Sequence, residues 1–138
     1  MHVTFTNRRI DYPIVKINGT QLPVQTEVKY LGLLLDQNLT WRPHITAKKT
    51  KINHKLRQIH WLIGRKSKLT TESKLLLCKV ILKPIWTYGV QLWGCSKPSN
   101  TKIIQRIQSK ILRMVFNAQR YVSNKTLDES SGKPFVED

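Results

Sequence analysis

A nearly unbroken apolar run, Val28-Lys29-Tyr30-Leu31-Gly32-Leu33-Leu34-Leu35-Asp36, constrains the fold of this chain more than any other feature. A short apolar run bounded by polar residues is typical of a strand that is buried on at least one face. The segments before the run are short and β-like, whereas the segments after it have the spacing of amphipathic helices. We therefore predict a strand over 28–36 that joins a small sheet to a helical body.

The residues before this run predict short strands. Val3–Thr6 and Ile14–Ile17 are rich in residues that favour strands, and Asn18-Gly19 supplies the pair that a tight hairpin turn needs for positive φ. Leu22–Val24 returns from that turn, so the strand over 28–36 would close one antiparallel sheet. Because so thin a sheet has no helix to cover it, we expect that a segment upstream is missing and that Met1 is either an internal methionine or a misplaced start.

Three helices are predicted after residue 39. The first has an apolar face at helical spacing, formed by Ile45, Ile52, Leu56, Ile59 and Ile63. The second follows an N-cap at Thr70 or Thr71, is apolar nearly all round and should therefore be a core helix surrounded by the others, with a kink at Pro84. The third follows an N-cap at Ser99 or Asn100. The predicted fold class is α+β: a small antiparallel sheet or hairpin over 1–38, a three-helix bundle over 39–117, and a C-terminal loop over 118–138.

The charge balance points to a polyanionic partner. The chain has 24 Lys plus Arg against 8 Asp plus Glu, a formal net charge of +16, and Glu72 is the only carboxylate between Asp36 and Asp128. Nucleic acid is the first partner that such a balance suggests, and an anionic membrane surface is the second. The most apolar segment, 75–93, is interrupted by Lys79, Lys83 and Pro84, so we expect a packed helix and no membrane partner.

Two clusters of cations are candidate nucleic-acid-binding residues. Lys102, Arg106, Lys110 and Arg113 form a stripe on the third helix, and Lys48, Lys51 and Lys55 share a face of the first. No acid is interleaved for ion pairing within the third-helix stripe, so contact with backbone phosphates is favoured over the alternative of an ordinary solvated face. Trp41 and Trp61 are candidates for base stacking, although packing is the more common role of tryptophan.

The chain offers no recognisable catalytic site. Asp11, Glu27, Asp36 and Glu72 are single and scattered, whereas metal-dependent nucleotidyl transfer needs clustered carboxylates. The two cysteines and the four histidines lack the paired spacing of a zinc site. We therefore expect no catalytic residue, no metal site and no cofactor in this chain, which should not be an enzyme by itself.

Several collinear motifs resemble the reverse transcriptases of jockey-type non-LTR retrotransposons. The resemblance covers essentially the whole chain, and it is strongest in Leu82-Lys83-Pro84-Ile85-Trp86-Thr87-Tyr88-Gly89-Val90-Gln91-Leu92-Trp93-Gly94. Further segments that carry it are Val28–Leu33, Leu39–Ile45, Trp61–Leu69, Ile104–Lys110 and Tyr121–Asn124. The metal-binding Asp-Asp motif of the family has no counterpart here.

The resemblance implies a C-terminal palm-edge and thumb segment of an RNA-directed DNA polymerase. Lys29, Tyr30, Leu31 and Gly32 would then be primer-grip residues, although the sequence supports a plain buried strand equally well. The helices would grip an RNA–DNA or DNA primer–template duplex, and the parent polymerase would bind magnesium in the missing upstream region. An intracellular location, nuclear or cytoplasmic, is expected.

Two alternatives stay open at this point. A self-standing basic nucleic-acid-binding module derived from a retroelement would need to fold alone. A non-functional degenerate fragment would be prone to aggregation, because core faces such as Leu31, Leu33 and Leu35 would lack a partner.

Overall fold

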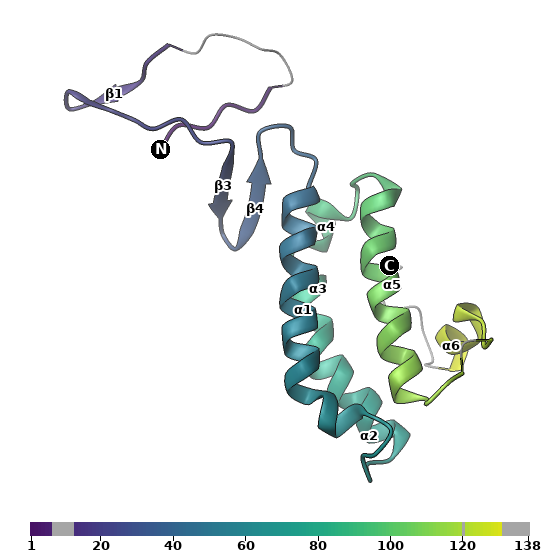
Figure 1. The fold of residues 1–138 in the computed structure, drawn as a ribbon. Helices are drawn as coiled ribbons and strands as arrows, with labels where there is room; N and C mark the ends of the chain where they lie inside the picture. Colours follow the sequence, from purple (N-terminus) through teal and green to yellow (C-terminus); the bar gives the residue numbers. More distant parts are fainter. Residues whose placement is uncertain (7–12, 120, 131–138) are drawn as a thin grey trace. The chain divides into compact units, whose positions relative to one another are not determined.

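The structure is a computed structural model that describes residues 1–6, 13–119 and 121–130, apart from the side chains of residues 128 and 130. It divides into two compact units, Met1–His44 and Ile45–Asp138 (Figure 1). Strands lie in the first unit, and helices make up the described part of the second. This succession of strands and helices confirms the predicted α+β class.

The first unit contains two separate antiparallel hairpins among its described residues. Strand β1 (Lys16–Ile17) pairs with β2 (Thr20–Gln21), and β3 (Glu27–Tyr30) pairs with β4 (Leu33–Asp36). Asn18 and Gly19 have φ values of 48° and 78°, so the predicted turn is confirmed. The prediction of one continuous sheet is wrong, as is that of a strand over residues 3–6, which are irregular except for a bridge between His2 and Val24.

The apolar run over 28–36 is a hairpin and not the single strand that its composition predicts. Leu31 and Gly32 have φ values of 45° and 77°, and two consecutive residues with positive φ reverse the chain between β3 and β4. Tyr30 and Leu31 are 62% and 70% exposed at the tip, whereas Leu33 is buried. The sequence misleads here because the first turn residue is leucine, which rarely adopts this conformation.

The second unit begins within a long helix, α1 (Arg42–Ile63). Its predicted apolar face is confirmed, because each member is buried. These residues are Ile45, Ile52, Leu56, Ile59 and Ile63. The helix ends at a turn in which the Gly64 amide donates to the His60 carbonyl, and the Gly64 carbonyl accepts from the Ser67 amide and the Lys74 ammonium.

The next segment of chain is a broken helical arm: α2 (Thr71–Leu77), the π-helical turn η1 (Cys78–Leu82), α3 (Lys83–Thr87) and α4 (Val90–Trp93). Thr70 caps α2 by accepting a hydrogen bond from the Ser73 amide, as predicted. The predicted disturbance at Pro84 is also present. Proline supplies no N–H and its ring crowds the preceding turn, and in η1 the Lys83 amide reaches back five residues to the Cys78 carbonyl.

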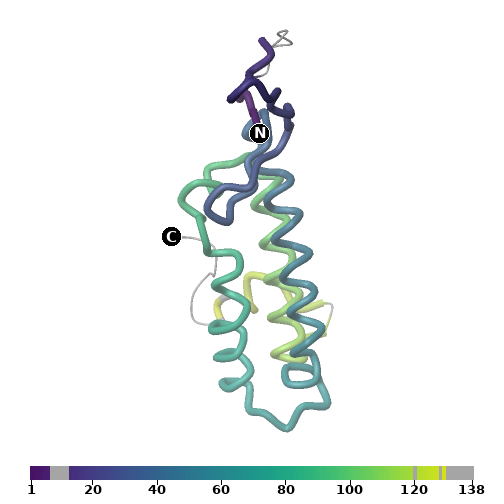
Figure 2. The backbone as a smooth tube through the Cα atoms, turned by 90° about the vertical axis from the view of Figure 1, so that its left-hand side faces the viewer, coloured from purple at the N-terminus to yellow at the C-terminus, as the bar shows by residue number. Residues whose placement is uncertain are grey.

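The broken arm is apolar all round, but only one side of it is covered. Cys78, Leu82, Trp86 and Trp93 are buried. Leu76, Val80 and Leu92 are instead 62%, 64% and 56% exposed, so the prediction of a helix surrounded by others is wrong. The two long helices of the unit, α1 and α5, lie on the same side of the arm (Figure 2).

Helix α5 (Pro98–Val115) completes the unit together with the short α6 (Asn124–Ser130). The apolar face of α5 is confirmed, with Ile104, Ile107, Ile111 and Val115 buried. The helix has Lys97 at its N-cap, two to three residues before the predicted cap. The prediction of a loop from residue 118 onward is wrong for α6. Its first turn is closed by the Ser123 hydroxyl, which accepts from the Thr126 amide, and it buries Leu127. Residues 131–138 lie outside the described part.

Within the described residues, no helix is both long enough and apolar enough to cross a bilayer.

Candidate nucleic-acid interface

Helices α1 and α5 lie side by side (Figure 2), and residues of both line a shared groove. A pocket of about 220 Å³ lies in this groove. Lys49 and Asn53 line it from α1, while Ile103, Arg106, Ile107 and Lys110 line it from α5. Its lining therefore combines three cations and one amide with two isoleucines.

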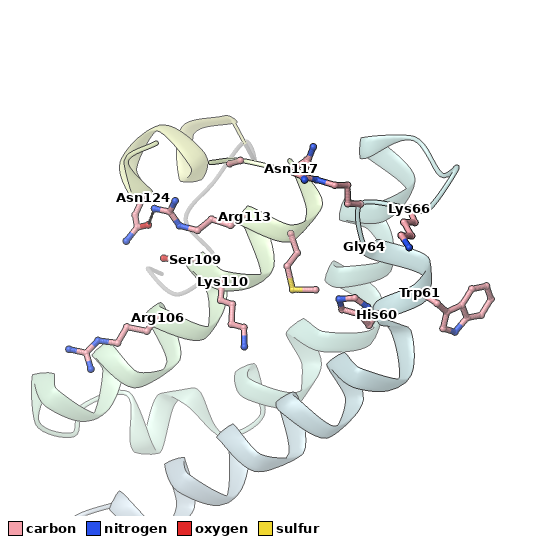
Figure 3. A pocket seen from close by; sticks show the side chains of 13 residues that line it. His60, Trp61, Gly64, Lys66, Arg106, Ser109, Lys110, Arg113, Asn117 and Asn124 are labelled. Atoms are coloured by element: carbon pink, nitrogen blue, oxygen red, sulfur yellow. Dashed lines mark hydrogen bonds between the residues drawn. The ribbon is translucent and has the colours of Figure 1, made fainter. Parts of the chain in front are cut away.

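A second and larger pocket, of about 980 Å³, lies where both helices end (Figure 3). Its aromatic and apolar lining comes from His60, Trp61, Met114 and Ala118, and its polar lining from Ser109, Asn117 and Asn124. The remaining lining residues are Gly64 and the cations Arg65, Lys66, Arg106, Lys110 and Arg113. Arg106 and Lys110 line both pockets, so the two are neighbouring parts of one surface.

We call this surface the basic groove and define it by Lys49, Arg65, Lys66, Arg106 and Lys110. Among the described residues, no Asp or Glu lines either pocket. The cations of the groove are exposed, so their charge is presented to solvent. An acid-free groove of this kind is electrostatically suited to a polyanion.

The predicted α5 stripe is only partly available to a ligand. Arg106 and Lys110 line the groove, and Lys102 is exposed one turn before them. Arg113 is engaged within the protein: its guanidinium donates to the carbonyls of Gln119 at 3.0 Å and Val122 at 2.7 Å, and to Asn124 Oδ1 at 2.8 Å. The observed contacts of Arg113 attach the segment leading to α6 to the end of α5.

The predicted α1 cluster lies outside the groove. Lys48 is half-buried; its ammonium donates to the Ile85 carbonyl of α3 at 2.8 Å and lies 4.9 Å from the centre of the Tyr88 ring. Burial, with a smaller contribution from the nearby charge of Lys51, lowers the pKa of Lys48 below its ordinary 10.5. Lys51 and Lys55 are exposed, but neither lines a pocket of the groove.

The sequence prediction missed Lys49, Arg65 and Lys66. Successive residues of a helix are rotated by roughly 100°, so Lys48 and Lys49 face different neighbours. The available signal was the flank formed by Lys49, Asn53 and His60, which borders the apolar face of α1 on the side opposite Lys48. Which flank meets α5 depends on the packing of the bundle, and a single helix does not reveal it.

The predicted primer-grip residues lie together at one hairpin of the first unit. Lys29 and Tyr30 end β3, while Leu31 and Gly32 form the turn. The base of this hairpin is braced by Asp36, whose carboxylate accepts from the Thr40 amide and hydroxyl and from the Trp41 amide. These hydrogen bonds lower the pKa of Asp36 and outweigh the opposing effect of burial. Primer contact by the tip stays a prediction.

The four tryptophans divide between packing and exposure. Trp86 and Trp93 are buried, as predicted for packing residues. Trp41 is half-buried and makes an edge-to-face contact with His44, with the ring centres 5.9 Å apart. Trp61 is 73% exposed at the edge of the larger pocket. Trp61 is therefore the tryptophan best placed to meet a ligand.

No group of three or more His, Cys, Asp or Glu side chains within the described residues could hold a metal ion. Burial raises the pKa of the Cys78 thiol to about 11, and Cys95 is exposed.

The chain is similar to polymerases encoded by insect transposons. It is 40% identical over 126 residues, 91% of its length, to the Drosophila melanogaster protein named "Probable RNA-directed DNA polymerase from transposon X-element". It is 34% identical over 127 residues to the "RNA-directed DNA polymerase from mobile element jockey" of Drosophila funebris, which covers 92% of the chain. With the jockey protein of Drosophila melanogaster it shares 33% identity over 137 residues, or 99% of the chain.

The chain spans 14% of the length of the first two relatives and 15% of the third. No protein-family model matches it, and no solved structure matches it significantly. The motifs that predicted the family resemblance are thus supported by identity along almost the whole chain. Over about nine tenths of its length, the chain is therefore homologous to a segment of the RNA-directed DNA polymerases of jockey and related non-LTR transposons.

Proposed function

We propose that this chain is the duplex-gripping segment of a retrotransposon reverse transcriptase, and that it holds a primer–template duplex through the basic groove. The single observation that carries the proposal is the lining of the groove, which holds no acid among the described residues and gathers Lys49, Arg106 and Lys110 from two helices that lie side by side. Cations arranged in this way neutralise backbone phosphates and position a duplex without reading its sequence.

The chemistry of nucleotide transfer would belong to the rest of the polymerase. Four carboxylates of this chain are single and scattered, and the other four form the pairs Asp128-Glu129 and Glu137-Asp138 in polar segments near its end. We therefore propose that the chain contributes no catalytic residue, and that magnesium is bound by the parent enzyme elsewhere. The hairpin tip, Lys29–Gly32, is proposed to contact the primer end. Its exposed Tyr30 and Leu31 are available for such a contact.

The test is duplex binding as a function of salt concentration. Replacing Lys49, Arg106 and Lys110 by Gln should weaken binding of an RNA–DNA duplex, measured by fluorescence anisotropy. If each cation neutralises one phosphate, the slope of log affinity against log salt should fall in magnitude by about two to three units.

The matched control replaces Lys68, Lys79 and Lys97 by Gln, which removes the same charge from exposed positions that line neither pocket. The control should retain most of the slope, and circular dichroism should report unchanged helix content in both variants. Equal losses of slope in the two variants would contradict the groove and indicate a diffuse effect of net charge.

A second candidate is a self-standing nucleic-acid-binding module, and the core of the helical unit favours it. Ile52, Ile63, Leu82, Trp93 and Ile104 are almost completely buried there. A self-standing module should unfold cooperatively as the isolated chain, with far-ultraviolet dichroism and tryptophan fluorescence giving coincident urea transitions. Non-coincident or absent transitions would contradict this candidate.

A further inference from the structure

We infer that the larger pocket of the helical unit binds an unpaired nucleotide that adjoins the gripped duplex. This inference rests on the proposed duplex grip, and it adds a second kind of ligand, a single-stranded nucleic-acid segment, at the end of the same groove. Four properties of the pocket carry it: its charge, its flat apolar surfaces, its amide groups and its continuity with the groove.

The charge of the pocket suits a phosphodiester. Lys66 lies on one side of the pocket and Arg106 and Lys110 on the other (Figure 3). Arg65 also lines the pocket, and no acid does so among the described residues. Arg65 uses its Nε to donate to Asn117 Oδ1 at 2.6 Å, which holds the guanidinium at the pocket while its terminal nitrogens make no hydrogen bond within the described chain. Phosphate oxygens are the natural acceptors for such nitrogens.

The pocket also carries surfaces that a phosphate does not need. His60 and Trp61 line the pocket from the end of α1, where the His60 ring points toward α5 and the Trp61 indole points away from it, at the outer edge (Figure 3). Met114 and Ala118 line the pocket from the α5 side. The volume of about 980 Å³ falls at the upper end of typical ligand pockets, roughly 300–1,000 Å³. An aromatic edge beside an apolar lining can accept the face of a base, because every base has a π-face for stacking.

Polar groups at the far wall can meet the edge of a base. The oxygens of Asn117 and Asn124 accept from Arg65 and Arg113, so both amides are oriented by the protein. With each oxygen engaged, the amide nitrogen is the group left to donate to a ligand. Base edges display ring-nitrogen and carbonyl acceptors, and those of the Watson–Crick edge become available to such amide donors when the base is unpaired.

These properties distinguish a single strand from a duplex. A duplex keeps its bases stacked inside and presents mainly phosphates to a row of cations, so the part of the groove that holds the smaller pocket is sufficient for it. Apolar and aromatic lining is useful only for bases that have left the stack. Since Arg106 and Lys110 line both pockets, a strand that follows the cations of α5 leads from the duplex part into the larger pocket.

The experiment compares a blunt RNA–DNA duplex with the same duplex carrying a short unpaired overhang, using the full chain. The overhang should tighten binding of the wild-type chain by about five-fold or more, the lower end of the contribution of one stacked base. Trp61→Ala should abolish this gain without changing the affinity for the blunt duplex. A fluorescent purine analogue in the overhang should be quenched by the wild-type chain and not by the variant.

Tyr121→Ala is the matched control, because Tyr121 is an aromatic residue that is 80% exposed and does not line the pocket. It should retain both the overhang gain and the quenching. Two results would overturn this inference and leave the proposed duplex grip standing. One is a gain from the overhang that persists in Trp61→Ala; the other is no gain from the overhang while binding of the blunt duplex depends on salt. If the wild-type chain does not bind the blunt duplex, the proposed duplex grip itself is overturned.

Discussion

The ammonium of Lys48 donates a hydrogen bond of 2.8 Å to the main-chain carbonyl of Ile85 and thereby ties α1 to α3. The same ammonium lies 4.9 Å from the centre of the Tyr88 ring, within the range of a cation–π interaction. In the structure, a lysine predicted to contact phosphate therefore joins two helices of the same unit.

Replacing Lys48 by Met should destabilise the chain. The substitution keeps the aliphatic packing of the side chain but removes the hydrogen bond and the charge over Tyr88, so the free energy of unfolding should fall by roughly 1–2 kcal/mol in urea titrations. Lys51→Met removes an exposed charge and should change stability by less than about 0.5 kcal/mol. Equal effects of the two substitutions would show that the Lys48 contacts contribute nothing measurable.

The lowered pKa of Lys48 predicts a pH dependence of stability. Below its ordinary value of 10.5, the unfolded chain holds the Lys48 proton more tightly than the folded chain does, so this residue's contribution to stability rises as pH increases through that window. The difference in unfolding free energy between wild type and Lys48→Met should therefore grow from neutral pH toward 10.5. The comparison cancels the general relief of charge repulsion, which both proteins share. If this difference in unfolding free energy instead decreases between neutral pH and 10.5, the pKa of Lys48 is not lowered in the folded chain.

Arg113 should act through α6 and not through nucleic acid. Arg113→Gln removes two hydrogen bonds to the segment before α6 and one to Asn124 at its start. Amide hydrogen exchange at Leu127 should therefore accelerate by one to two orders of magnitude, corresponding to about 1.4–2.8 kcal/mol. The salt slope of duplex binding should change less than it does for Lys110→Gln. A change of slope larger for Arg113→Gln than for Lys110→Gln would show that Arg113 contacts phosphate.

Leucine is an unfavourable first residue for the turn between β3 and β4. Leu31 has a φ of 45°, and the left-handed region costs a branched L-residue about 1 kcal/mol or more relative to residues that tolerate it. Leu31→Asn should therefore stabilise the hairpin by about 1 kcal/mol, because Asn-Gly is the preferred pair for this turn. Slower amide exchange along β3 and β4 would report the gain, and Gly32→Ala, at a φ of 77°, should have the opposite effect.

The two cysteines should differ sharply in reactivity. Cys78 is 1% exposed with a pKa raised to about 11, and the thiolate is the reactive form, so it should resist alkylation in the folded chain. Cys95 is exposed and should react first, with one equivalent of label found on it by mass spectrometry. Labelling of Cys78 should appear only in denaturant. Equal labelling of both under native conditions would contradict the burial of Cys78.

The helical faces could be predicted because each is a local pattern. Ile52 and Ile59 on α1, and Ile104 and Ile111 on α5, repeat at helical spacing and are buried in the structure. The Thr70 cap and the Asn18-Gly19 turn were equally predictable, since each depends on the chemistry of a few adjacent residues. Local physics therefore gives the elements and their inward faces.

The arrangement of those elements was not predictable in the same way. The Leu31-Gly32 turn is hidden within an apolar run, and α6 depends on burying Leu127, a single apolar residue in a polar segment. For the candidate site, the cations of α5 could be predicted from the sequence. Lys49 lies beside them only because α1 packs with the flank that carries Lys49 and Asn53 toward α5. Arg113 is not available as a phosphate-binding cation, because its guanidinium donates to the carbonyls of Gln119 and Val122, which lie beyond its own helical turn.

The π-helical turn Cys78–Leu82 has a consequence for which length changes the helical unit can tolerate. A turn of this kind holds one residue more than a regular turn, so a deletion of one residue within it could be absorbed by reverting to ordinary helix. A deletion of one residue in the middle of α1 or α5 would instead rotate the rest of that helix by roughly 100° and turn its later side chains, including cations of the basic groove, away from the groove. We therefore expect single-residue gaps among homologous sequences to gather at 78–82 and to avoid 49–63 and 103–110.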